Sequence, residues 1–166
     1  MKIQTSRFGE VEFSEDVLIQ FPEGVLGFPE DQRYLLLEHD AENSPFKWLQ
    51  SVDSPDLAFI VVDPLLLRTD FAVMIDSDTA RIIGLDDAAE SACMAIINVP
   101  DGNPGHMTAN LKAPLVVNPA LRLGRQIIIG SQNFSISEPV FPRLNERLAE
   151  LDSQTQAVGA PDAATA

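Results

Sequence analysis

Residues 46–62, FKWLQSVDSPDLAFIVV, contain two short apolar runs separated by a cluster of turn-forming residues. The runs at 46–52 and 57–62 are shorter than most helices, and their aromatic and β-branched side chains favour strands. The DSPD segment at 53–56 combines Asp, Ser and Pro, which favour turns. This stretch therefore predicts two strands joined by a turn.

The same alternation of short apolar runs and turn residues continues in both directions along the chain. The further runs expected to form strands are residues 2–7, 11–13, 17–21, 34–37, 71–75, 92–99, 107–111, 115–118, 126–129 and 134–137. Many short strands with turns between them predict a mainly β protein, and 166 residues suit a single domain. We therefore expect a small antiparallel β-barrel or sandwich-like single domain with one or two short helices.

Two segments carry helical signals. Asp76 is expected to cap a short helix that follows it. Residues 142–152 are expected to form a C-terminal helix, because proline suits its first turn and leucines recur on one face. The remaining chain lacks large apolar side chains. The expected division is a β-barrel-like domain at 1–141, this helix, and a flexible Ala-rich tail at 153–166.

The charge of the chain is strongly acidic. It carries 11 Lys and Arg residues against 25 Asp and Glu residues, a formal net charge of −14. Proteins bind nucleic acids and anionic membranes through basic surfaces, so this composition argues against direct contact with either. It favours basic protein partners, although a role in solubility alone also explains it.

The expected location is the cytoplasm. The first seven residues, MKIQTSR, lack the apolar core of a signal peptide, and the apolar run at 57–62 ends at Asp63, too soon to span a membrane. Cys93 is the only cysteine in the sequence, which excludes an internal disulfide. Its small apolar neighbours indicate a buried structural residue.

Motifs for common reactions are absent from the sequence, so we expect no catalytic residues, no cofactor and no metal. His39 and His106, for example, have no Cys or His at metal-ligand spacing. Two alternatives stay open. Asp76 and Asp78 follow an apolar run as in haloacid-dehalogenase-type phosphatases, although Ala80 stands where that motif has Thr or Val. The many Val, Ile and Leu residues also suit a β-barrel that binds a small apolar ligand.

The segment FPEGVLGF at 21–28 combines glycines, aromatic residues and a proline in an unusual order, and MTANLKAPLVVN at 107–118 contains a further proline among apolar residues. They resemble the F-x-x-G-[ILV]-x-G-F signature and the T-x-N-L-x-A-P block of the FliW family of flagellar assembly factors. GRQII at 124–128 is similar to its G-x-Q-x-[IV] strand. Three further segments stand in the family's order: YLL at 34–36, PFKWLQSVD at 45–53 and LAFIVVDP at 57–64. The resemblance covers roughly residues 1–140.

This resemblance implies a small β-barrel-like protein without catalytic activity. Proteins of the FliW family bind CsrA, a basic RNA-binding translational regulator, and prevent it from repressing flagellin mRNA. They also bind newly made flagellin, which frees CsrA when flagellin accumulates. The resemblance thus implies CsrA and flagellin as partners, without direct contact to nucleic acid or membrane.

Partner contacts are expected in one loop and in its acidic surroundings. The candidate partner-binding residues are Phe21, Glu23, Gly24, Leu26, Phe28, Asp53, Asp56 and Asp63. Structural roles are the alternative for several motif positions. Gly24 and Gly27 can supply positive φ angles in a tight loop. Trp48 and Phe59 can be core anchors, and Asn110 can satisfy backbone groups at a strand end.

Overall fold

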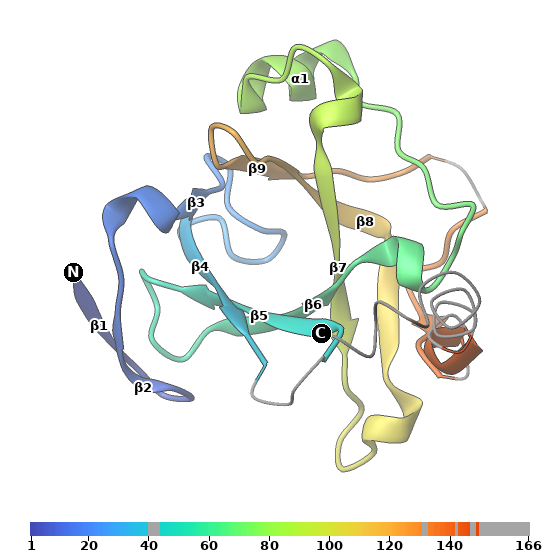
Figure 1. Cartoon of the computed structure of the whole chain (residues 1–166), viewed down its shortest axis with the longest axis horizontal. Helices are drawn as coiled ribbons and strands as arrows, with labels where there is room; N and C mark the ends of the chain where they lie inside the picture. Colours follow the sequence, from blue (N-terminus) through green and yellow to red (C-terminus); the bar gives the residue numbers. More distant parts are fainter. Residues whose placement is uncertain (40–43, 131–132, 142, 147–148, 150–166) are drawn as a thin grey trace, which may run out of the picture.

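The computed structural model describes residues 1–39, 44–130, 133–141, 143–146 and 149. Strands dominate these residues and wrap around a common interior (Figure 1). Of the C-terminal helix expected at 142–152, the described residues are helical and the others lie outside the description. The tail expected at 153–166 also lies outside it.

Seven strands of the described chain form a closed barrel. They are β3 (Ile19–Gln20), β4 (Arg33–Glu38), β5 (Phe46–Ser51), β6 (Ala58–Val62), β7 (Ala92–Asn98), β8 (Thr108–Asn118) and β9 (Leu123–Gln126). Neighbours pair antiparallel from β3 through β8, and β9 pairs antiparallel with β8. A short parallel bridge between Gln20 of β3 and Leu123 of β9 closes the barrel. The predicted mainly β fold is thereby confirmed.

The first two strands cover part of the outside of the barrel. β1 (Lys2–Thr5) and β2 (Gly9–Glu12) form an antiparallel hairpin, which packs on the outward-facing Leu35 of β4. The hairpin turn places Phe8 edge-on against Trp48, with 5.7 Å between ring centroids. Trp48 therefore packs under the hairpin on the outer surface and not among the core residues, contrary to the expected core anchor.

Short helices connect some of the strands. α1 (Ser77–Ile83) begins after Asp76, whose carboxylate accepts a hydrogen bond from Thr79 N at 2.7 Å, and it ends at Gly84. The predicted short helix and its cap are confirmed. The described chain also contains 3-10 turns at η1 (Glu15–Val17), η2 (Pro64–Leu66), η3 (Ala88–Glu90) and η4 (Pro104–His106). None of the described helices is long and apolar enough to cross a membrane.

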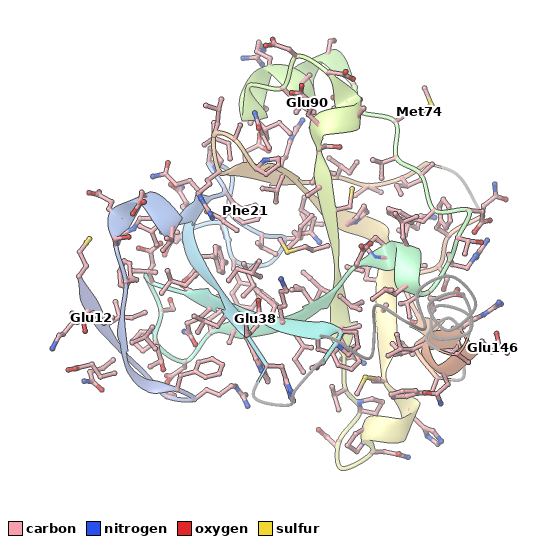
Figure 2. All side chains as sticks on the ribbon, viewed as in Figure 1. Glu12, Phe21, Glu38, Met74, Glu90 and Glu146 are labelled. Atoms are coloured by element: carbon pink, nitrogen blue, oxygen red, sulfur yellow. The ribbon has the colours of Figure 1, made fainter. Side chains whose placement is uncertain are left out.

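Three strand predictions were wrong in place or in kind. Residues 71–75 are not a strand: no strand of the described chain pairs with the segment, and Met74 is 96% exposed and points away from the barrel (Figure 2). The strand expected at 126–129 ends at its first residue, as the last residue of β9. The strand expected at 134–137 is displaced to β10 (Glu138–Pro139), which pairs with β8.

The two apolar runs on either side of Pro114 belong to one strand, β8, although its pairing with β7 jumps between Asn110 and Leu115. Proline has no N–H for a ladder and is tolerated at such an irregularity. Asn110 Oδ1 accepts hydrogen bonds from Lys112 N at 3.1 Å and Ala113 N at 3.0 Å. The expected role of Asn110 in satisfying backbone groups is confirmed, but Asn110 lies within β8 and not at a strand end.

Apolar clusters lie on both sides of the barrel wall. The interior cluster of buried residues consists of Ile19, Phe21, Val25, Tyr34, Leu49, Val61, Leu115 and Val117. The cluster outside the wall consists of Val62, Leu67, Phe71, Ala95, Ile97, Ala109, Leu111, Phe134, Val140 and Leu144. Successive residues of a strand point to opposite faces. In β6, for example, Val61 belongs to the interior cluster and Val62 to the outer one, so both faces of β6 to β8 are apolar. These strands separate the two clusters.

Candidate functional site

The two ends of the barrel carry different features. At one end, the loop at 21–28 between β3 and β4 lies beside the turn at 52–57 between β5 and β6. We call this the loop end. At the opposite end, Asp63 follows β6 and lines a cavity between the strands together with Cys93 of β7. We call this the cavity end.

Backbone hydrogen bonds and two glycines shape the loop at 21–28. Gly24 N donates a hydrogen bond to Phe21 O at 2.8 Å. Gly24 and Gly27 have φ angles of +71° and +89°, which confirms the expected positive φ at both positions. A Cβ atom at Gly24 would lie 2.4 Å from Phe28 O, so this turn requires glycine.

The loop divides its predicted partner-binding residues into buried and exposed groups. Phe21 is fully buried and packs edge-on against Tyr34, with 5.5 Å between ring centroids. In contrast, Leu26 is 60% exposed and Phe28 is 39% exposed. The Phe28 ring is held edge-on by Phe59 at 5.5 Å between centroids. Exposed apolar side chains in fixed positions suit the docking of a partner, whereas Phe21 supports the loop from below.

Two residues of β9 hold the loop in place, and the sequence reasoning assigned them no such role. Arg125 Nε donates a hydrogen bond to Glu23 Oε2 at 2.8 Å. Gln126 Oε1 accepts one from Leu26 N at 2.7 Å. The loop is therefore tied to the barrel wall through both a side chain and its backbone.

Gly124 of β9 completes this support. A Cβ atom at this position would lie 2.5 Å from the ring of Phe21, so the glycine makes space for the buried ring. The signal was present in the sequence, because Gly124, Arg125 and Gln126 belong to the GRQII motif. They are separated from the loop by about a hundred residues, however, and only the closure of the barrel brings β9 beside β3.

Asp53 lies beside the loop and secures the chain that leaves it. One carboxylate oxygen accepts hydrogen bonds from Gln32 N at 3.0 Å and Arg33 N at 3.1 Å, and the other accepts one from the Arg33 guanidinium at 2.7 Å. Burial raises the pKa of Asp53, but these hydrogen bonds outweigh it and hold the pKa below its usual value. A further bond at 2.7 Å joins the hydroxyl of Ser51 to the buried carboxylate of Asp31.

Asp56 and Asp63 lie at different ends of the molecule. Asp56 is exposed at the loop end and accepts a hydrogen bond from the hydroxyl of Ser6 in the hairpin. Asp63 lies at the cavity end, where its Oδ1 accepts a hydrogen bond from Leu65 N at 3.0 Å and caps η2. The structure therefore brings the loop, Asp53 and Asp56 together and separates them from Asp63.

The loop end is acidic around its exposed apolar residues. Its carboxylates are Glu23, Glu30, Asp31, Asp53 and Asp56. Two nearby guanidinium groups are already engaged, Arg33 with Asp53 and Arg125 with Glu23. Among the described residues, no group of three or more His, Cys, Asp or Glu side chains is arranged to hold a metal ion.

Asp76 and Asp78, the pair on which the phosphatase alternative depends, have structural partners. Hydrogen bonds from Thr79 hold the pKa of the Asp76 carboxyl below its usual value as it caps α1. Asp78 Oδ2 lies 3.4 Å from Arg125 Nη1, and the same nitrogen donates to Thr79 Oγ1 at 2.8 Å. Haloacid-dehalogenase-type enzymes use an alternating α/β sheet, whereas this chain forms a β-barrel.

These features define a small closed β-barrel protein with an apolar, carboxylate-flanked loop at one end. The model of the family described as FliW protein matches residues 2–140. A flagellar assembly factor FliW from Caldanaerobacter subterraneus subsp. tengcongensis is 35% identical over 144 residues, which cover 87% of this chain and 95% of the relative. The chain therefore belongs to the FliW family.

Further relatives agree with this assignment. A flagellar assembly factor FliW from Syntrophus aciditrophicus is 40% identical over 136 residues, covering 82% of this chain and 85% of the relative. A crystal structure of the flagellar assembly factor FliW superposes with a TM-score of 0.76 at 32% identity, covering 86% of this chain and 98% of the other. The resemblance found in the sequence motifs is confirmed.

Proposed function

We propose that this protein is a non-enzymatic cytoplasmic regulator that binds CsrA, relieves its repression of flagellin mRNA, and exchanges CsrA for flagellin. Membership of the FliW family supports a role in flagellar assembly. The observation that carries the finer proposal is the loop end, where exposed Leu26 and Phe28 stand among carboxylates in a chain of net charge −14. This combination suits a basic protein better than RNA or an anionic membrane.

The exposed loop residues and the carboxylates have different roles in this proposal. Leu26 and Phe28 are the apolar anchors, because desolvated apolar side chains at the centre of an interface contribute most of its affinity. Glu23 and Asp56 lie around them, where charged groups speed and orient the approach of a basic partner. Gly24 and Phe21 act indirectly, by fixing the shape of the loop.

Antagonism of RNA binding follows from the charge. An acidic protein docked beside the RNA-binding surface of CsrA lowers the local positive potential and repels phosphates, even where it leaves the RNA site uncovered. Such repulsion acts over the Debye length, about 8 Å at physiological ionic strength.

Flagellin would reach the same loop by its apolar character. In this proposal flagellin binds as an amphipathic helix, and such helices dock their apolar face against apolar surfaces on a partner. If Leu26 and Phe28 serve both partners, CsrA and flagellin compete for the loop end, and accumulating flagellin releases CsrA.

Substitutions in the loop test the assignment of the binding surface. Leu26→Ala and Phe28→Ala are each expected to weaken CsrA binding about tenfold or more in isothermal titration calorimetry, because truncated anchors cost about 1–2 kcal/mol or more. Met74→Ala is the matched control, since Met74 is equally apolar and 96% exposed but lies on the segment before α1. Unchanged CsrA affinity in both loop variants would place the interface elsewhere.

Salt dependence tests the electrostatic mechanism separately. The ability to displace RNA from CsrA, measured by fluorescence anisotropy of labelled RNA, is expected to fall with added salt more steeply than the affinity for CsrA falls. An antagonism that stays constant while the complex remains intact would indicate direct steric cover of the RNA site.

A further inference from the structure

The cavity end contains an apolar cavity that the proposed partner exchange does not use. Its volume is about 370 Å³, and strands from β3 to β8 supply its walls. The aliphatic part of the wall includes Ile19, Leu36, Val61, Met94 and Val117. Cavities that hold small ligands measure about 300–1,000 Å³, and the mouths of β-barrels are common places for them. This cavity is at the small end of that range, which suits a single short chain.

The side chains that line the cavity favour a ligand whose chain carries no polar groups. Among the described residues that line the cavity there is no aromatic side chain and no Ser, Thr, Asn or Gln. A ligand with polar groups along its body would therefore lose its hydrogen bonds to water without replacement. The walls suit an unsubstituted hydrocarbon.

Two cationic residues line the same cavity, although the chain as a whole is strongly acidic. Lys47 pairs with Glu38 at 3.3 Å, and the two side chains are 44% and 77% exposed, so this ion pair is weak and exchangeable. Asp63 also lines the cavity, but its carboxylate is engaged in capping η2. Arg122 is the second cation.

Arg122 differs from most of the described arginines in its surroundings. Ion pairs within 4.0 Å of a carboxylate are formed by Arg33, Arg68, Arg81, Arg125 and Arg143. For Arg122 the described residues provide none, and its Nη1 donates a hydrogen bond to Val17 O at 3.1 Å. The pKa of Asp16 is lowered, chiefly by the hydroxyl of Ser14 and least by the charge of Arg122. The guanidinium retains donors for another anion.

The backbone of Arg122 is also unusual. Its φ angle of +54° is the only positive one at a non-glycine position in the described chain. Its carbonyl oxygen accepts a hydrogen bond from Gln20 N at 2.9 Å, at the bridge that closes the barrel. Glycine would be easier to accommodate at this φ angle. The presence of arginine at a position where the barrel closes is therefore consistent with a role for its side chain.

We propose that the cavity binds a small amphipathic carboxylate, with its aliphatic chain between the walls and its headgroup at Lys47 and Arg122. This inference is independent of CsrA and flagellin binding at the loop end. It assigns a ligand class to the cavity end of the barrel, and charged hydrogen bonds from the two cations would select a carboxylate over a cationic or neutral headgroup.

Calorimetric titration with decanoate on the full chain tests the proposal, and decyltrimethylammonium is the comparison of the same chain length. Decanoate is expected to bind at one site and at least about tenfold more tightly than the ammonium compound. Equal binding of the two, or no binding of decanoate at millimolar concentration, would overturn the proposal.

Two charge-removing variants locate the headgroup. Arg122→Gly and Lys47→Gln are each expected to weaken decanoate binding about tenfold. Glycine suits the φ angle of +54°, so the first variant removes the guanidinium without straining the backbone. Lys2→Gln removes the same charge from the exposed hairpin and should leave decanoate binding unchanged.

A measurement without any substitution checks the location. Because Cys93 lines the cavity, saturating decanoate is expected to slow alkylation of the Cys93 thiol by iodoacetamide about fivefold or more. Decanoate binding that leaves both the alkylation rate and the Arg122→Gly affinity unchanged would place the ligand at another site.

Discussion

The loop end and the cavity end belong to one barrel, yet different physical terms stabilise them. At the loop end, glycine conformations and hydrogen bonds to Glu23, Leu26 and Asp53 hold apolar side chains out in water. At the cavity end, strands from distant parts of the chain bring aliphatic side chains together around a cavity. The closed barrel thus carries an exposed, hydrogen-bonded loop at one end and an apolar cavity at the other. Substitutions should therefore act mainly through backbone geometry and hydrogen bonds at the loop end, and mainly through solvation and charge at the cavity end.

The largest effect is expected from Gly24→Ala. The new Cβ would lie 2.4 Å from Phe28 O at a φ of +71°, so strain and overlap together should cost about 3 kcal/mol of unfolding free energy. Gly27→Ala is the control, because its φ is +89° but nothing lies within 4 Å of the added Cβ, and about 1–2 kcal/mol is expected. Urea denaturation measures both. Equal losses would mean that close packing does not define the loop.

At the cavity end, the expected effect is slow alkylation of the Cys93 thiol. Burial, with the charge of Asp63 as a second cause, raises the pKa of the Cys93 thiol to about 11. The thiolate fraction at pH 8 is then about a hundredfold lower than for an ordinary thiol, and alkylation should be slowed correspondingly. The chain unfolded in urea is the control. Similar rates in the folded and unfolded chain would mean that the cavity end is open to water.

The pH dependence of the unfolding free energy tests how much the hydrogen bonds of Asp53 stabilise the loop end. The pKa of Asp53 is lowered in the folded state, so its contribution is present above the unfolded pKa near 3.8 and is lost as the pH falls through the folded value. Asp53→Asn should cost about 1–2 kcal/mol at pH 7 and less below pH 4.

The matched control is Asp56→Asn, which removes a carboxylate from the same turn. Thermal denaturation between pH 2.5 and pH 7 measures the difference. A loss of stability in Asp53→Asn that is constant over this range contradicts the assignment.

The smallest expected effect is a difference in stability between two substitutions of Arg122, which distinguishes the contribution of its backbone conformation from that of its side chain. Arg122→Ala and Arg122→Gly lose the same guanidinium, but only alanine is strained at a φ of +54°. Arg122→Ala should therefore be less stable than Arg122→Gly by about 1 kcal/mol, the reverse of the usual order at ordinary positions. Equal urea midpoints for the two variants would remove the evidence for strain at the barrel closure.

Sequence reasoning succeeded where a structure depends on a few neighbouring residues. The cap at Asp76, the positive φ at Gly24 and Gly27, and the side-chain role of Asn110 involve groups within three or four positions of each other. It failed at 71–75, because a strand needs a partner and no described strand lies there to pair with the apolar run. It also placed Phe21 and Leu26 in the same group, although one is buried and the other is 60% exposed.

The amino-acid sequence alone was sufficient for the mainly β class, the acidic character and the family, because composition, short-range turn chemistry and ordered motifs are all local properties. Tertiary structure decided which loop residues face solvent, how Arg125 and Gln126 hold them, and which residues line the cavity. The reason is that burial and cavities arise between segments about a hundred residues apart, and their distance is fixed only when β3 meets β9 and the barrel closes.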